Sequence, residues 1–213
     1  MRFSVDAFNT FLGGIGQAYN WYQATRCPCI DPHSGAAKPN CQLCFGKGYQ
    51  FASAVPGVAG LSGQKTQRAW EQSGNYERGD IVVTIPSDTP LYAIGQFDRI
   101  TALSATNPFS LVLTSGMAAK ERLIFAVQSI TGVSWINAAG TGMVQGGIPT
   151  VNANGTLSWP NGGQPPAGVQ YTIKGTKFLD YFCFGEYAQN RAHNGGLTLP
   201  RRVVLRDFDL FNR

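Results

Sequence analysis

The chain has 213 residues, 43% of them hydrophobic, so it is long and apolar enough to fold around a sizeable core. Its formal net charge is +5, and only 14% of its residues are charged, against roughly 25% in typical globular domains. No block of like charges marks a nucleic-acid arm, and no apolar run approaches the roughly 20 residues of a membrane helix. Composition therefore excludes a disordered chain and a helical membrane protein, and it predicts that other subunits cover part of the surface.

Residues 1–26 are predicted to form a docking helix that covers the β-rich body or a neighbouring subunit. Between Ser4 and Thr25, apolar side chains recur at steps of three and four and share one helix face: Val5, Phe8, Leu12, Ile15, Tyr19 and Tyr22. Ser4 is a suitable N-cap, while three glycines weaken the helix and allow a break near Gly13. Asp6 interrupts the apolar core that a secretory signal needs, so we expect a chain made and kept in a cytoplasm.

Residues 27–49 are predicted to be a metal-binding loop. Cys27, Cys29, Cys41 and Cys44 have the spacing C-x-C-x11-C-x2-C, and the second pair is followed by two glycines, as in a zinc knuckle. Four thiolates would complete a closed tetrahedral structural zinc site, with His33 as the reserve ligand. A reducing cytoplasm favours metal over oxidation. Two disulfides, free thiols and an iron–sulfur cluster remain open as alternatives.

The rest of the chain is predicted to be a linker followed by a mainly β domain, a small β-barrel. Residues 50–75 are interpreted as a linker or arm that includes a short helix over 64–72. From residue 76 to residue 213, β-branched runs alternate with turn signals, which favours a barrel or sandwich. The predicted strands cover 80–86, 98–104, 110–114, 122–130, 169–174, 178–188 and 201–208. Within this domain, the Gly- and Pro-rich residues 138–168 are predicted to form a long protruding hairpin that turns at Asn154-Gly155.

No catalytic residue is predicted. The two histidines, His33 and His193, lack a recognisable nucleophile nearby, and we interpret His193 as a polar loop residue. Cys183 lies in a predicted strand and is interpreted as a buried core thiol. The arginines of the last predicted strand, Arg201, Arg202 and Arg206, either protect an edge strand or pair with acidic residues of an adjacent subunit.

Several phrases of the chain together resemble neck proteins of tailed bacteriophages, the head–tail connector, head-closure or collar components. They are CPC…CxxCxGxGY, ERGDIVVTIPSDTPLY…FDRI and the closing LPRRVVLRDFDLF, which follow an N-terminal helix. The resemblance covers most of the chain except the Gly- and Pro-rich excursion. It implies a small β-barrel that assembles as a ring around the DNA channel, without catalytic residues, and with Cys27, Cys29, Cys41 and Cys44 as a structural metal site.

What the resemblance implies is a virion structural protein, assembled in the bacterial host cytoplasm. Its partners would be copies of itself, portal or adaptor proteins and tail proteins, with no membrane and no sequence-specific DNA contact. The competing hypothesis is a zinc-stabilised cytoplasmic module that binds nucleic acid or protein. A hydrolase with a structural zinc is a third hypothesis, and it would need a pocket with perturbed carboxylates.

Overall fold

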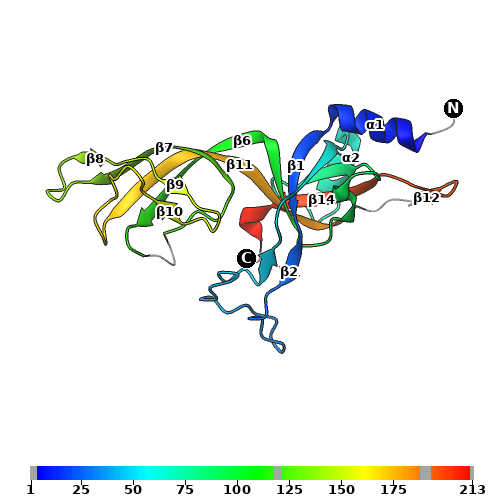
Figure 1. The fold of residues 1–213 in the computed structure, drawn as a ribbon. Coiled ribbons are helices and arrows are strands. Elements are labelled where there is room, and N and C mark those ends of the chain that lie inside the picture. The colour runs from blue at the N-terminus through cyan, green and yellow to red at the C-terminus, as the bar shows by residue number, and fades with distance from the viewer. Residues whose placement is uncertain (1–3, 118–120, 188–192, 212–213) are drawn as a thin grey trace. The chain divides into compact units, whose positions relative to one another are not determined.

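The structure is a computed structural model that describes residues 4–117, 121–187 and 193–211 (Figure 1). It confirms a mainly β protein with an N-terminal helix and one large antiparallel sheet. The helices are α1 Val5–Ile15 and α2 Gln64–Glu71, with 3-10 turns η1 Pro90–Ala93 and η2 Phe208–Leu210. The strands are β1 Gln17–Tyr22, β2 Ala24–Arg26, β3 Tyr49–Phe51, β4 Val55–Leu61, β5 Ile81–Ile85, β6 Arg99–Thr114, β7 Val127–Ile136, β8 Met143–Gln145, β9 Thr150–Val151, β10 Leu157–Ser158, β11 Gln170–Glu186, β12 His193–Asn194, β13 Leu197–Thr198 and β14 Arg201–Asp207.

The chain divides into two compact units. Unit 1 comprises Met1–Ser104 with Asp180–Arg213, and unit 2 comprises Ala105–Leu179. The large sheet has the strand order β14-β5-β4-β1-β6-β11-β7-β8, and β14 pairs additionally with β11. The two longest strands, β6 and β11, each begin in one unit and end in the other.

The predicted N-terminal helix is shorter than expected. Ser4 caps α1 by accepting a hydrogen bond from the backbone N–H of Ala7, but the helix ends at Ile15 instead of Thr25. A Cβ at Gly16 would lie 2.5 Å from Cγ1 of Val58, so only glycine lets the chain turn this close to β4. The chain then continues as β1, in which the side chain of Tyr19 is buried in the core. The helical spacing of Tyr19 was therefore misleading, because alternation in a strand buries it equally well.

The interpretation of residues 50–75 as a linker is wrong for strand β4, which lies in the sheet between β5 and β1. Its glycines obscured the strand pattern because they serve close packing. A Cβ on Gly57 would come within 2.7 Å of the Leu91 side chain in η1, and one on Gly60 within 2.8 Å of Leu12 in α1. The short helix expected over 64–72 is present as α2.

Several predicted strands are longer or differently placed in the structure. The segments 98–104 and 110–114 form one continuous strand, β6, and 169–174 and 178–188 are joined in β11. The run 122–130 becomes strand only from Val127, at the start of β7. Strands β5 and β14 match their predicted positions closely.

The prediction of one long protruding hairpin over 138–168 is wrong, because β8 pairs with β7 in the large sheet and only β9 and β10 form a hairpin. The excursion belongs to unit 2, which has its own apolar core. It turns at Gly155, whose φ of 82° favours glycine and whose backbone N–H donates to the carbonyl of Asn152 at 2.8 Å. The hairpin β9–β10 around this turn packs side chains against the core of unit 2. The buried residues of that core are Leu123, Val133, Tyr171 and Ile173, and Val151, Leu157 and Trp159 of the excursion lie against them.

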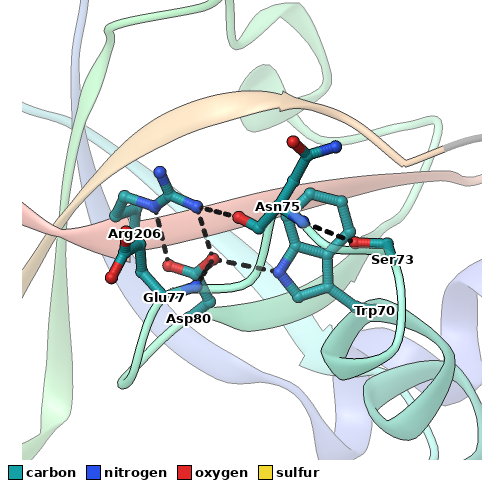
Figure 2. A network of polar contacts seen from close by, with 6 residues as sticks. All are labelled: Trp70, Ser73, Asn75, Glu77, Asp80 and Arg206. Carbon is teal, nitrogen blue, oxygen red and sulfur yellow. Dashed lines mark hydrogen bonds and ion pairs between the residues drawn. The ribbon is translucent and has the colours of Figure 1, made fainter.

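The closing strand β14 is not an edge strand, since it pairs with β5 on one side and with β11 on the other. Arg206 pairs with Asp80 of the same chain, so the alternative predictions for this arginine, edge protection or a bridge to another subunit, are both wrong (Figure 2). The guanidinium donates to both carboxylate oxygens at 2.9 Å. Trp70 Nε1 and the backbone N–H of Glu77 donate to the same carboxylate at 3.0 and 3.1 Å, so its buried charge is fully satisfied.

Candidate metal centre

The cysteine loop begins and ends on a short two-stranded ribbon of unit 1. In Figure 1 the loop lies below the label β2. Strands β2 and β3 pair antiparallel, with Ala24 opposite Phe51 and Arg26 opposite Tyr49. The ladder is extended by a hydrogen bond of 2.8 Å from the backbone N–H of Cys27 to the carbonyl of Gly48. The ribbon therefore brings the start of the loop, which carries the first cysteine pair, close to the end of the loop, which follows the second cysteine pair.

Backbone turns shape the second half of the loop into a knuckle around Cys41 and Cys44. The N–H of Phe45 donates to the carbonyl of Cys41 at 2.8 Å, and the N–H of Lys47 donates to that of Cys44 at 3.0 Å. Gly46 has a φ of 82°, and a Cβ there would lie 3.2 Å from the carbonyl oxygen of Pro39. The glycine after the second cysteine pair, noted in the sequence, is therefore required by the backbone.

The structure brings the four predicted cysteines together. All four sulfur atoms lie within 4.8 Å of one another. The Sγ atoms of Cys27 and Cys41 are 3.8 Å apart, and those of Cys29 and Cys44 are 3.4 Å apart, with no disulfide among them. Tetrahedral zinc with Zn–S bonds of about 2.3 Å separates its sulfur ligands by about 3.8 Å. The donor set therefore fits a metal ion such as zinc.

Hydrogen bonds and loss of solvation shift the thiol pKa values in opposite directions. Backbone N–H groups of Cys44 and Leu43 point at Cys41 and lower its pKa to about 6, and the N–H of Cys29 lowers the pKa of Cys27. Desolvation raises the pKa of Cys29 to about 12. A bound cation would favour the thiolate form of its sulfur ligands.

The proposed reserve ligand, His33, is not part of the four-sulfur group. Its backbone N–H donates to Oδ1 of Asp31 at 2.9 Å in a tight turn that also receives the N–H of Ser34. These two bonds lower the pKa of Asp31. The His33 side chain is exposed to solvent, so the four cysteines alone form the candidate ligand set.

An aromatic cluster anchors the ribbon to the rest of unit 1, and the sequence analysis missed it. Tyr49 of β3 packs against Phe97 and Phe211, with ring centroids 5.1 and 5.4 Å apart. The Nζ of Lys47 donates to the backbone carbonyl of Phe211 at 3.0 Å. The signal was the aromatic density of GYQF and of the closing DFDLF, but nothing in the sequence showed that these segments meet.

The knuckle also exposes apolar side chains. Leu43 is 65% exposed and Phe45 is 39% exposed. Phe45 has a φ of 52°, a left-handed backbone that is uncommon for a residue other than glycine. The exposed side chain of Leu43 therefore offers apolar surface on the knuckle for contact with another molecule.

The other residues considered in the sequence lie away from this centre. Cys183 is buried, as interpreted, and burial raises its pKa to about 12. His193 is exposed, but it lies in the short strand β12 opposite Thr198 and not in a loop as interpreted. Among the described residues, no helix has the length and apolar character needed to cross a membrane. A scan against protein-family models and a search of curated proteins found no match for the chain.

Proposed function

We propose that this chain is a virion structural protein of the phage neck, which assembles as a ring joining portal and head to tail around the DNA channel. The outward face of α1 carries this proposal. The helix buries Val5 and Leu12 against unit 1, yet Phe11 and Ile15 are 56% and 62% exposed. A monomer would place charged side chains on that face, but Asp6 is the only charge in the helix. Exposed large apolar side chains on a helix whose other face is already buried are expected to meet a partner.

In this proposal the chain folds as a small β-barrel, and the barrels of neighbouring copies form the wall of the ring. The pairings β14-β5-β4-β1-β6-β11, together with that of β11 back to β14, form a closed circuit of strands. Closure would remove the free strand edges that invite uncontrolled pairing between copies. Contacts between copies would then be left to α1, the metal loop and the side chains of unit 2.

The role of the metal centre in this proposal is structural. Four cysteine ligands fill the tetrahedral positions of zinc and leave none for a reacting water. Because no residue between Cys29 and Cys41 is buried in this fully described stretch, the ion would replace the missing apolar core. The chain would act mechanically and not as an enzyme, with zinc fixing a loop at an interface.

The partners follow from ring geometry. A closed ring needs a surface on each copy that meets a different surface on the next, and the α1 face is one such surface. Portal or adaptor proteins and tail proteins would meet the two ends of the ring. DNA would pass through without being read, and the net charge of +5 is compatible with that passage. Assembly would take place in the bacterial host cytoplasm and the product would reside in the virion.

The alternative is a zinc-stabilised cytoplasmic module that binds a protein or a nucleic acid. The exposed Leu43 and Phe45 of the knuckle favour this alternative, because they give a compact apolar patch on a metal-fixed loop. It requires no ring, so the state of assembly separates the two functions.

The experiment measures solution mass and zinc content of the purified chain, alone and mixed with a portal ring. Rings of about six or twelve copies, a size expected from the resemblance and from cyclic closure, support the neck function. The double substitution Phe11→Asp and Ile15→Asp should abolish assembly while leaving the far-ultraviolet circular dichroism unchanged. Lys65→Asp on the exposed, polar face of α2 is the matched control and should assemble normally. A metal-free monomer that binds DNA with steep salt dependence overturns the proposal.

A further inference from the structure

We propose that the cysteine loop has a second covalent state, in which Cys27 is bonded to Cys41 and Cys29 to Cys44. This state forms when a peroxide-class oxidant reaches the sulfurs, and its formation releases the metal. The pairing follows from the sulfur geometry. Its biological setting rests on the proposed function, because a virion protein leaves the reducing cytoplasm in which it is assembled.

The first observation is the arrangement of the sulfur atoms. Four cysteines allow three pairings. In the structure, two separate pairs are in direct contact, Cys27 with Cys41 at 3.8 Å and Cys29 with Cys44 at 3.4 Å. Each contact joins the first half of the loop to the knuckle. Both bonds can therefore form together without exchanging partners.

The second observation is that each pair combines a buried sulfur with an accessible one. Cys27 and Cys44 are 2% and 5% exposed, whereas Cys29 and Cys41 are half-buried. An oxidant therefore reaches one member of each pair first. The buried member, already in contact, is placed to attack the oxidised sulfur before a second molecule of oxidant arrives.

The chemistry balances with hydrogen peroxide as the oxidant. The accessible thiol loses its proton and attacks one peroxide oxygen as the thiolate; the O–O bond breaks, a sulfenic acid forms, and the released hydroxide takes up that proton as water. The buried thiol then attacks the sulfenic sulfur, the S–O bond breaks and water leaves. Each disulfide consumes one peroxide and two thiols and yields two waters. The metal ion leaves unchanged in oxidation state, because its four ligands no longer carry negative charge.

The loop can therefore be held in the same conformation either by the metal ion or by the two disulfides. Each disulfide links the segment after β2 to the knuckle before β3, as the metal does. The rival pairing, Cys27 with Cys29 and Cys41 with Cys44, would close only short local rings and would leave the two halves of the loop untied. Cross-links over longer stretches of chain restrict the unfolded state more strongly than short ones do.

The experiment treats the zinc-loaded full chain with hydrogen peroxide and counts free thiols after denaturation. The count should fall from five, the total of cysteines in the chain, to one, the buried Cys183. Cleavage after Arg26 and Lys47 and before Asp31 then separates the first cysteine pair from the second. The two fragments should stay linked until a reductant is added. Separate fragments, or a count that stays at five, overturn the proposal.

Double serine variants then distinguish the two cross-linked pairings. Cys27→Ser with Cys41→Ser keeps the Cys29–Cys44 pair, and Cys27→Ser with Cys44→Ser keeps Cys29 with Cys41 as the matched control. The first variant should form its disulfide faster than the second, because its two sulfurs are already 3.4 Å apart. Equal rates would overturn the assignment. The wild-type arm carries no substituted ligand, so misfolding of a variant does not stop the test. Neither readout depends on ring assembly, so this proposal and the neck function can fail separately.

Discussion

The strand pair β5–β14 and the cysteine loop belong to the same unit, but different interactions hold them in place. In the strand pair, Val82, Val83 and Leu205 are completely buried. In the loop, the stretch between Cys29 and Cys41 buries no side chain, although all of it is described. Burial of apolar side chains stabilises the strand pair, whereas we propose that the loop depends on a bound ion or on disulfides between its cysteines.

The difference teaches where a substitution should act globally and where it should act locally. Apolar burial is shared among many neighbours, so losing one member of the core weakens the whole cooperative unit. Coordination is shared among four sulfurs alone, so losing one ligand should disorder the loop and leave the sheet folded. Three substitutions test this contrast.

The largest effect is expected for Asp80→Ala, beside β5. This change leaves the Arg206 guanidinium, whose side chain is 13% exposed, without its carboxylate. Removing one partner of a buried ion pair costs about 3–5 kcal/mol. The free energy of unfolding, measured by urea denaturation, should fall by that amount.

Glu186→Ala is the matched control, because it also removes a carboxylate that pairs with an arginine of β14. The Glu186 side chain is 74% exposed, so its pair with Arg201 is screened by water. Exposed pairs contribute about 0–1 kcal/mol. Similar urea midpoints for the two variants would show that the Asp80 network is not a buried element of the core.

The second prediction concerns Cys44→Ser, which removes one ligand of the metal centre. The backbone amides of residues 27–48 should lose their protection from hydrogen exchange, and bound zinc should fall from one ion per chain to none. Amides of β5 and β14 should keep their protection. Cys183→Ala, which removes a cysteine outside the centre, should keep one zinc ion. Global loss of circular dichroism in Cys44→Ser would contradict the idea of a locally ordered loop.

The sequence predicted the cysteine cluster well because its information is local. The ligand spacing and the glycine at position 46 lie within one short segment, and the structure brings all four sulfurs together. Strands β5 and β14 were predicted equally well, because their β-branched runs are compact. Helix α2 was found for the same reason.

The parts that the sequence did not predict depend on contacts between distant segments. Strand β4 carries Gly57 and Gly60 because η1 and α1 pack closely on it, and neither neighbour is visible from local sequence. Gly16, which caps the end of α1, lies close to Val58 and Ala59 of β4, and this contact too is invisible in local sequence. The internal pairing of Arg206 joins residues 126 positions apart, so only the fold reveals it.

The smallest effect is expected for Lys47→Met, which tests whether the two regions are coupled. Lys47 lies in the metal loop, and its Nζ donates to the carbonyl of Phe211, beside the aromatic cluster that anchors the ribbon. Methionine keeps the apolar stem but removes the donor, and a hydrogen bond of this kind contributes about 1 kcal/mol. Exchange of the Phe211 amide, which donates to Phe208, should therefore become about fivefold faster. Lys38→Met, at an exposed position of the same loop, should leave that amide unchanged. If zinc removal accelerates the Phe211 amide in the wild type but not in Lys47→Met, this hydrogen bond transmits the state of the metal loop to the C-terminal turn. Acceleration of equal size in both would assign that coupling to the packing of Tyr49 instead.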